Sequence, residues 1–202
     1  MKVDAKIMVN THLVKSEKLL FFRRWLKAPK QLGTLAPISK RLAHSAAKLV
    51  HDAACVKVVE IGAGTGRLTR TLIECGIKPD NLTAVELDET FCNFLKKSLP
   101  QANIIHGDAC ELPALLGEKL VGKVDIVFSV IPLMYLDSAI REQIMNQALA
   151  VLKPGGKFYH VCYTPVSPFK KNETIESNRL VSLWMNIPPG FVWEFRRVNS
   201  LI

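Results

Sequence analysis

The chain has 202 residues, 49% hydrophobic and 22% charged, which suits one domain with a substantial core and leaves little room for a second. Its five cysteines form no C-x-x-C pair, and no segment approaches the roughly 20 apolar residues that span a bilayer, so we expect reduced thiols, no metal and a cytoplasmic protein. The net charge of +9 favours an anionic partner, without choosing among nucleic acid, a lipid surface and an acidic substrate.

The N-terminal quarter interleaves basic and aromatic residues. This pattern predicts an imperfect amphipathic helix over 12–27, which contains Trp25, and a second helix over 39–52 after the proline-containing segment 29–37. We therefore expect a basic helical segment over 1–36, acting as a lid towards a membrane or substrate, and a single α/β domain over 37–202.

The most informative segment is a β-branched run, 56–61, that ends in Glu60-Ile61 and continues as Gly62-Ala63-Gly64-Thr65-Gly66. The run predicts a buried parallel strand. The three alternating glycines predict a tight turn in which the backbone can approach a ligand without interference from Cβ atoms.

Strands and helices then alternate along the chain, which predicts a mostly parallel, doubly wound sheet with right-handed crossovers. Further strands are expected at 82–87, 103–106, 123–131 and 157–163, and helices at 67–75, 88–99 and 138–152. The last two extended runs, 181–186 and 191–197, predict an antiparallel hairpin that closes the sheet edge.

The spacing of the glycines indicates which class of cofactor the loop binds. A dinucleotide fingerprint needs its third glycine where Arg67 stands, so that interpretation fails at its last position. With Glu60 at the strand end, the Glu-x-Gly-x-Gly-x-Gly loop resembles the first motif of class I S-adenosylmethionine-dependent methyltransferases. The resemblance implies a Rossmann-like fold and S-adenosylmethionine as cofactor.

Other strand ends carry groups that suit the same cofactor. Glu86 can accept hydrogen bonds from a ribose diol, and Asp108 from an adenine amino group, although Asp108 could instead be a helix N-cap. The resemblance to the methyltransferase series covers residues 56–163. The residues expected to bind the cofactor are Glu60, Gly62, Ala63, Gly64, Gly66, Glu86, Leu87, Asp108, Ala109 and Ser129.

The end of the fourth strand bears on the methyl acceptor. Methyltransferases of nucleobase amines carry Asn/Asp-Pro-Pro-aromatic or Asn-x-Pro-aromatic there, whereas this chain reads Ser129-Val130-Ile131-Pro132-Leu133. The missing amide and aromatic groups make nucleic acid an unfavoured partner. Adenine N6 methylation of ribosomal RNA stays open as an alternative.

Segments at both ends of the chain resemble bacterial phospholipid N-methyltransferases. The similar segments are 22–29, 33–37, 129–133, 163–168 and 184–197. The resemblance implies methylation of phosphatidylethanolamine and its methylated derivatives towards phosphatidylcholine. It also implies an enzyme held peripherally at the inner face of the cell membrane, with an anionic membrane surface as partner. A lipid- or RNA-binding module without turnover is the non-enzymatic alternative.

Side chains for the acceptor are less well determined by the sequence. For proton removal and headgroup contact we expect Tyr163, with Tyr135 and His160 as further candidates. Strand alternation puts Tyr163 on the opposite face from His160. Aromatic walls and phosphate contacts are expected from Trp25, Pro132, Trp193, Arg196 and Arg197.

Overall fold

The computed structural model describes residues 38–169 and 174–198. The helix predicted over 12–27, the residue Trp25 and the predicted domain boundary near residue 36 lie outside the described residues.

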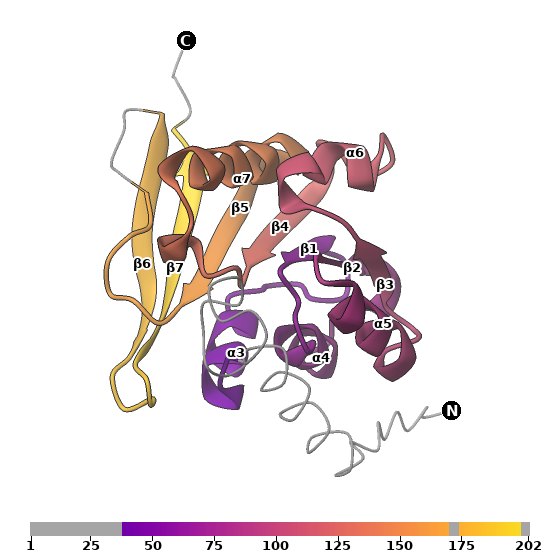
Figure 1. Ribbon diagram of the computed structural model, residues 1–202, viewed down its shortest axis with the longest axis horizontal. Helices are drawn as coiled ribbons and strands as arrows, with labels where there is room; N and C mark the ends of the chain where they lie inside the picture. Colours follow the sequence, from indigo (N-terminus) through magenta and orange to yellow (C-terminus); the bar gives the residue numbers. More distant parts are fainter. Residues whose placement is uncertain (1–37, 170–173, 199–202) are drawn as a thin grey trace. The chain divides into compact units, whose positions relative to one another are not determined.

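A seven-stranded sheet of order β3-β2-β1-β4-β5-β7-β6 forms the centre of the described part (Figure 1). The strands are β1 (Val58–Ile61), β2 (Leu82–Glu86), β3 (Asn103–His106), β4 (Val124–Ser129), β5 (Leu152–Cys162), β6 (Ile175–Leu183) and β7 (Gly190–Arg197). The first five pair in parallel, and β7 pairs antiparallel with both β5 and β6. The predicted doubly wound sheet with a C-terminal antiparallel hairpin is confirmed.

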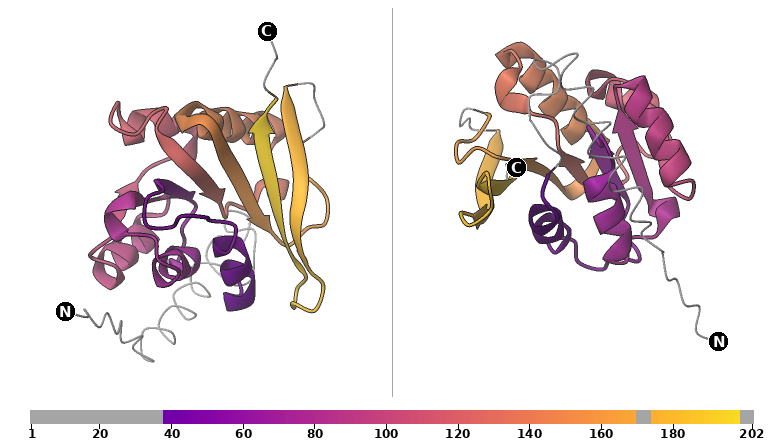
Figure 2. Two further views of the ribbon diagram at one scale, coloured as in Figure 1. Left: turned by 180° about the vertical axis from the view of Figure 1, so that it is seen from behind. Right: turned by 60° about the horizontal axis from the view of Figure 1, so that its bottom comes forward.

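Helices cover both faces of this sheet (Figure 2). They are α3 (Lys40–Ala47), α4 (Arg67–Glu74), α5 (Glu89–Ser98), α6 (Leu112–Leu116) and α7 (Ser138–Val151), with 3-10 turns η1 (Pro79–Asn81), η2 (Ala109–Glu111) and η3 (Leu133–Tyr135). On one face, α6 and α7 pack with Phe158 and Phe195. On the other, α3 and α4 pack with Tyr159 and Val161, while Leu95 of α5 packs against Ala84 of β2. Successive residues of each strand thus belong to different cores, as strand alternation requires.

The largest differences from the predicted strand boundaries are at the starts of β5 and β6. β4 also ends at Ser129 instead of residue 131, and β6 ends at Leu183 instead of residue 186. β5 begins at Leu152 instead of residue 157, because the turn residues 153–156 continue the strand, with Gly155 at φ 76°. β6 begins at Ile175 instead of residue 181. As an edge strand it exposes much of both faces, so it needs no apolar alternation, and its extent is decided by pairing with β7.

The helix predicted over 39–52 is shorter, since α3 ends at Ala47. Asp88 is the N-cap of α5, because its side chain accepts hydrogen bonds from the backbone N–H groups of Thr90 and Phe91. None of the described helices combines the length and apolar character that crossing a bilayer requires.

Candidate active site

The glycine loop connects β1 to α4 at the carboxyl edge of the parallel strands. Gly62, Gly64 and Gly66 have φ values of 75°, 55° and 78°, in the left-handed region that side chains rarely adopt. A Cβ on Gly62 would lie 2.6 Å from the side chain of Ile131, whereas a Cβ on Gly64 would meet no heavy atom within 4 Å. Gly62 is therefore required for packing, and Gly64 borders open space at the edge where ligands bind in sheets of this kind.

Glu86 closes one side of that space. Its carboxyl group accepts hydrogen bonds from the backbone N–H of Gly64 (2.6 Å) and of Asp88 (2.8 Å). Burial raises the pKa of Glu86 to about 7, against the lowering effect of the backbone hydrogen bonds. Each carboxylate oxygen has two lone pairs, so Glu86 can still accept hydrogen bonds from a ligand while it holds the loop.

Glu60 lies beneath the loop on β1 and is fully buried. Its Oε2 accepts a hydrogen bond from the hydroxyl of Thr69 on α4 (2.7 Å), while its Oε1 has no hydrogen-bond partner among the described residues. Burial raises the pKa of Glu60 to about 8, and the nearby negative charge of Glu86 contributes to the rise. The two carboxyl groups therefore disfavour each other's ionisation, a condition that a cationic ligand would relieve.

The end of β3 adds a third acidic group. The exposed Asp108 side chain accepts a hydrogen bond from the backbone N–H of Cys110 (2.8 Å), which makes it the N-cap of η2. Its other oxygen remains available, so capping does not conflict with ligand binding. Leu87 is 63% exposed directly after β2, and Ala109 is buried directly after Asp108.

This set of groups fits S-adenosylmethionine. The cofactor carries a positively charged sulfonium, an ammonium group and a ribose diol, which match two buried carboxyl groups with raised pKa values beside an open glycine. An exposed leucine next to the ribose-binding acid offers an apolar surface for an adenine ring. Glu60, Gly64, Glu86, Leu87 and Asp108 are the residues that would hold it.

A second group of polar side chains lies where β4 and β5 end, and we call Ser129, His160 and Trp193 the β4–β5 polar cluster. Ser129 pairs with His160 across the sheet, and His160 pairs with Trp193, so the three side chains share one face. Ser129 Oγ, both ring nitrogens of His160 and Nε1 of Trp193 are buried and make no hydrogen bond of standard geometry among the described residues. Buried polar atoms of this kind normally have partners, so their concentration indicates that water or a ligand group binds here.

The cluster adjoins the glycine loop, because Ser129 is also the register partner of Ile61, the residue before Gly62. Burial lowers the pKa of His160 to about 3, against a smaller raising effect from the backbone of Ser129, so the imidazole is neutral at pH 7. A neutral imidazole donates one hydrogen bond and accepts another.

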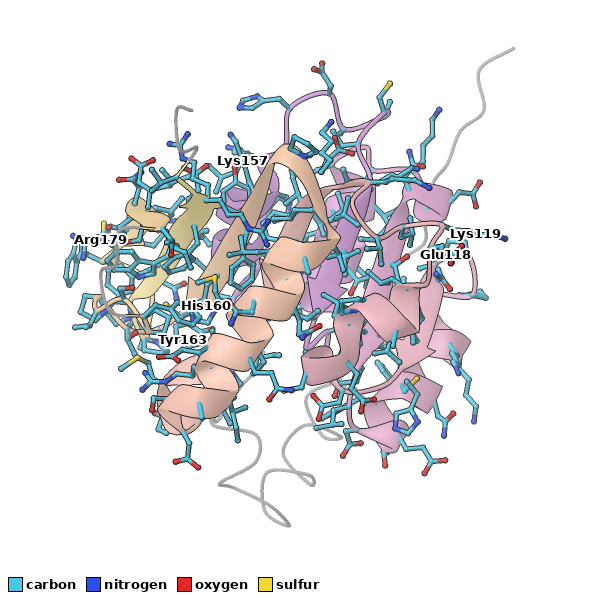
Figure 3. All side chains as sticks on the ribbon, turned by 90° about the horizontal axis from the view of Figure 1, so that it is seen from above. Glu118, Lys119, Lys157, His160, Tyr163 and Arg179 are labelled. Carbon is cyan, nitrogen blue, oxygen red and sulfur yellow. The ribbon has the colours of Figure 1, made fainter. Side chains whose placement is uncertain are left out.

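The structure separates the two predicted candidates at the carboxyl end of β5. Figure 3 shows Lys157 and His160 in order along β5, with Tyr163 directly after the strand. Tyr163 packs against the α3 and α4 core, and its hydroxyl oxygen accepts a hydrogen bond from the backbone N–H of Ser39 (3.1 Å). The predicted alternation is confirmed, and Tyr163 takes part in positioning α3. Tyr135, in η3 just after Pro132, is 69% exposed.

Arg196 and Arg197 lie away from these groups. β7 runs antiparallel to β5, so its last residues reach the amino edge of the parallel strands. There Arg196 forms ion pairs with Glu194 (3.2 Å) and Glu176 (3.4 Å). The structure therefore does not bring the two arginines to the site, although it brings Trp193 of the same strand beside His160.

A cavity of about 300 Å³ opens at that amino edge, lined among others by Lys57, Asp80, Asn103 and Lys119. It lies at the other end of the strands from the glycine loop. Since open α/β sheets bind ligands at their carboxyl edge, we do not assign the cofactor to this cavity.

Comparison with known proteins agrees with the glycine-loop geometry. A protein-family model described as a methyltransferase domain matches residues 58–156. This segment is a class I S-adenosylmethionine-dependent methyltransferase domain. S-adenosylmethionine is its methyl donor.

Two curated relatives resemble the chain over different extents. An ornithine lipid N-methyltransferase from Singulisphaera acidiphila is 26% identical over 150 residues, which cover 72% of this chain and 78% of that enzyme. A ribosomal RNA small subunit methyltransferase A from Chlorobium chlorochromatii is 46% identical over 52 residues, which cover 26% of this chain and 19% of that enzyme. The second similarity thus spans about a fifth of its relative's length.

Solved structures share the fold of the methyltransferase domain. TrmN from Thermus thermophilus superposes with a TM-score of 0.61 at 17% identity and covers 86% of this chain and 53% of its own. A TehB-like methyltransferase from Corynebacterium glutamicum gives 0.59 at 14% identity, covering 91% of this chain and 100% of its own. At these identities the similarity establishes the fold.

The sequence did not point to Thr69, which supports the methyltransferase site, or to a long-range contact that Arg141 makes outside the site. Thr69 lies in the first turn of α4 and orients Glu60; its position three residues after Gly66 was the available signal. Arg141 of α7 donates a hydrogen bond from Nη1 to the carbonyl of Pro168 (2.8 Å). That contact joins segments far apart in the sequence, so no local sequence pattern predicts it.

Proposed function

We propose that this protein transfers methyl groups from S-adenosylmethionine to the amine of a membrane lipid. The acceptors we favour are phosphatidylethanolamine and its methylated derivatives, which would lead towards phosphatidylcholine. The observation that carries the proposal is the similarity to an ornithine lipid N-methyltransferase over most of both chains. Phosphatidylethanolamine and ornithine lipids each present a primary amine, so the acceptor chemistry is the same.

The end of β4 supports a lipid amine over a nucleobase amine. An exocyclic base amine needs a polar group to hold it and an aromatic ring to stack on the base. In the corresponding segment Ser129 and Val130 are followed by Ile131, Pro132 and Leu133, which supply neither the polar group nor the aromatic ring. The ribosomal RNA enzymes match this chain closely but over a short segment, so RNA adenine methylation is the second candidate.

In the reaction the lone pair of the acceptor nitrogen forms a bond to the methyl carbon as the carbon–sulfur bond breaks. The positive charge moves from sulfur to nitrogen, and an acceptor that starts as an ammonium ion must first release a proton to water or to a side chain. Such a displacement depends mainly on holding the two reactants in line.

We place the acceptor amine beside the β4–β5 polar cluster. Ser129 and His160 are buried next to the glycine loop and have unused hydrogen-bonding capacity. A neutral His160 adds no positive charge that would repel an ammonium group, and its acceptor nitrogen can take a hydrogen bond from the amine. Tyr135, with Pro132 beside it, is exposed enough to present its ring to a methylated ammonium. Tyr163 remains a proposed headgroup contact.

The decisive experiment uses S-adenosylmethionine labelled in its methyl group. The full chain is incubated in parallel with vesicles containing phosphatidylethanolamine, with vesicles containing ornithine lipid, and with ribosomal RNA. The Gly64→Ala variant, which we expect to bind the cofactor more weakly, serves as a matched control. We expect label in lipid that depends on Gly64, and the first two arms tell the two lipid amines apart.

Label confined to RNA would overturn the lipid proposal in favour of adenine methylation. Cofactor binding without transfer in any arm would favour a binding module that does not turn over.

A further inference from the structure

The turn between β6 and β7 presents large apolar side chains to solvent. Trp184 is 63% exposed, Met185 84% and Ile187 97%. The sequence from residue 180 to residue 193 contains no charged residue. Three neighbouring apolar side chains with this exposure differ from the scattered surface hydrophobics of ordinary proteins, and they indicate an interaction surface.

The turn is held in shape from its inner side. The Asn186 side-chain oxygen accepts a hydrogen bond from the Ser39 hydroxyl (2.7 Å), which links the turn to the start of α3. The Trp184 ring packs edge-on against Phe191, with ring centroids 5.2 Å apart. Gly190 lies so close to Leu42 of α3 that a Cβ there would be 2.7 Å from the leucine side chain. The exposed side chains are thus carried on a fixed support.

Positive charge flanks the apolar turn. Helix α3 lies alongside it, as Figures 1 and 2 show, and exposes Lys40 and Arg41. Lys48, directly after the helix, is exposed too. The sequence from residue 39 to residue 51 contains no acidic residue. On the other side, the Arg179 guanidinium lies 5.7 Å from the centre of the Phe191 ring. An apolar apex with basic flanks is complementary to an anionic lipid surface, where each nearby cation adds about 1 kcal/mol.

The turn lies at the edge of the sheet that carries the active site. Cys162, at the end of β5, pairs with Phe191 near the start of β7, so the hairpin turn continues past the carboxyl end of β5. The glycine loop and Ser129 occupy the same edge. A bilayer that contacts the turn would therefore face the side of the protein where the methyl acceptor must arrive.

We propose that the β6–β7 turn and α3 form a membrane-docking surface. Trp184, Met185 and Ile187 enter the interface of an anionic bilayer, while Lys40 and Arg41 contact lipid phosphates. The inference rests on the proposed lipid substrate and adds the surface by which the enzyme reaches it. A bilayer is a better occupant than a protein, because three side chains at the apex of a turn cannot supply the roughly 800 Å² per partner of a standard protein interface.

The test is sedimentation of the full chain with vesicles of phosphatidylethanolamine and phosphatidylglycerol. The variant Trp184→Ser/Met185→Ser/Ile187→Ser should partition about 100-fold more weakly than the wild type, since three side chains lose their apolar burial. Because Trp184 also packs on Phe191, the double variant Met185→Ser/Ile187→Ser is measured too, and about tenfold weaker partitioning is expected. Replacing phosphatidylglycerol with phosphatidylcholine should weaken wild-type binding through the loss of anionic charge.

The matched control is Val198→Ser, which removes an apolar side chain that is 47% exposed beyond the other end of β7 and should leave partitioning unchanged. Vesicle binding by the double variant equal to that of the wild type would overturn the proposal. The proposal would also be overturned if neither the wild type nor the double variant bound vesicles, or if the wild type self-associated through the turn.

Methylation of lipid in detergent micelles is measured separately. Wild type and turn variants should act equally there, because no bilayer is needed. If no protein methylates micellar lipid although the turn variants lose vesicle binding, the proposed substrate fails and the docking surface stands.

Discussion

Replacing Gly64 with alanine separates the cost of backbone strain from the cost to cofactor binding. Gly64 has φ 55°, and a Cβ there would meet no protein atom within 4 Å. The alanine variant is therefore destabilised only by its left-handed conformation, which lowers the free energy of unfolding by about 1–2 kcal/mol. For a chain of this size that corresponds to a melting temperature lower by roughly 2–8 °C.

Cofactor affinity should fall as well, for a separate reason. The added methyl group would occupy the space in which S-adenosylmethionine approaches the loop. Overpacking of this kind costs about 1–3 kcal/mol, which corresponds to a Kd increase of roughly 5- to 150-fold. Saturating S-adenosylmethionine should raise the melting temperature of the wild type, and raise that of the variant far less.

Gly122 offers the matched control. It has φ 71° and no heavy atom within 4 Å of an added Cβ, and it precedes β4 at the amino edge of the sheet. Gly122→Ala should lose similar stability yet bind the cofactor as the wild type does. Calorimetric titration with S-adenosylmethionine and thermal unfolding of all three proteins measure both quantities. Equal affinity in the Gly64→Ala variant and the wild type would refute our placement of the cofactor.

Three further predictions follow from individual side chains. Glu60 keeps its proton in the folded state up to about pH 8 but loses it near pH 4.5 when unfolded, so the free energy of unfolding should fall as pH rises between these values. Glu60→Gln should remove this fall and be more stable than the wild type by roughly 5 kcal/mol at pH 9, measured by thermal melts across pH. Glu86 has a pKa of about 7, so cofactor affinity measured by calorimetry should rise as pH increases through 7 and the carboxyl group ionises. Glu86→Gln should bind the cofactor about 10- to 100-fold more weakly, and its affinity should not rise with pH in this range. Ser39 caps α3 by accepting a hydrogen bond from the N–H of Leu42 (3.0 Å), so Ser39→Ala should cost about 1–2 kcal/mol in denaturant unfolding, and an unchanged midpoint would contradict that role.

The parallel core was predictable from sequence because its strands are short, apolar and separated by helices. β1 and β2 are buried along their whole length, so most of their residues are apolar irrespective of their neighbours. The exceptions are Thr83 and the two acids of the site, Glu60 and Glu86. The boundaries of β5 and β6 were less predictable. There the pairing partner sets the strand length, and partners such as Arg197 and Ile175 are far apart in the sequence.

The candidate site also has one part that was predictable from the sequence and one part that was not. The glycine loop and Glu86 were predicted, since positive φ values and a strand-end acid leave local marks in the sequence. The polar cluster was not predicted as a unit. Ser129, His160 and Trp193 come from three strands, and only register makes them neighbours.

The sequence by itself determined the methyl donor and the fold that binds it, because both depend on residues close together along the chain. The tertiary structure decided where the remaining candidates lie. It placed Tyr163 against α3 and carried Arg196 to the opposite edge of the sheet. It also set the apolar turn at Ile187 beside the basic helix α3. These outcomes depend on strand direction and register, which arise from pairing between distant segments and are not encoded in any single stretch of the chain.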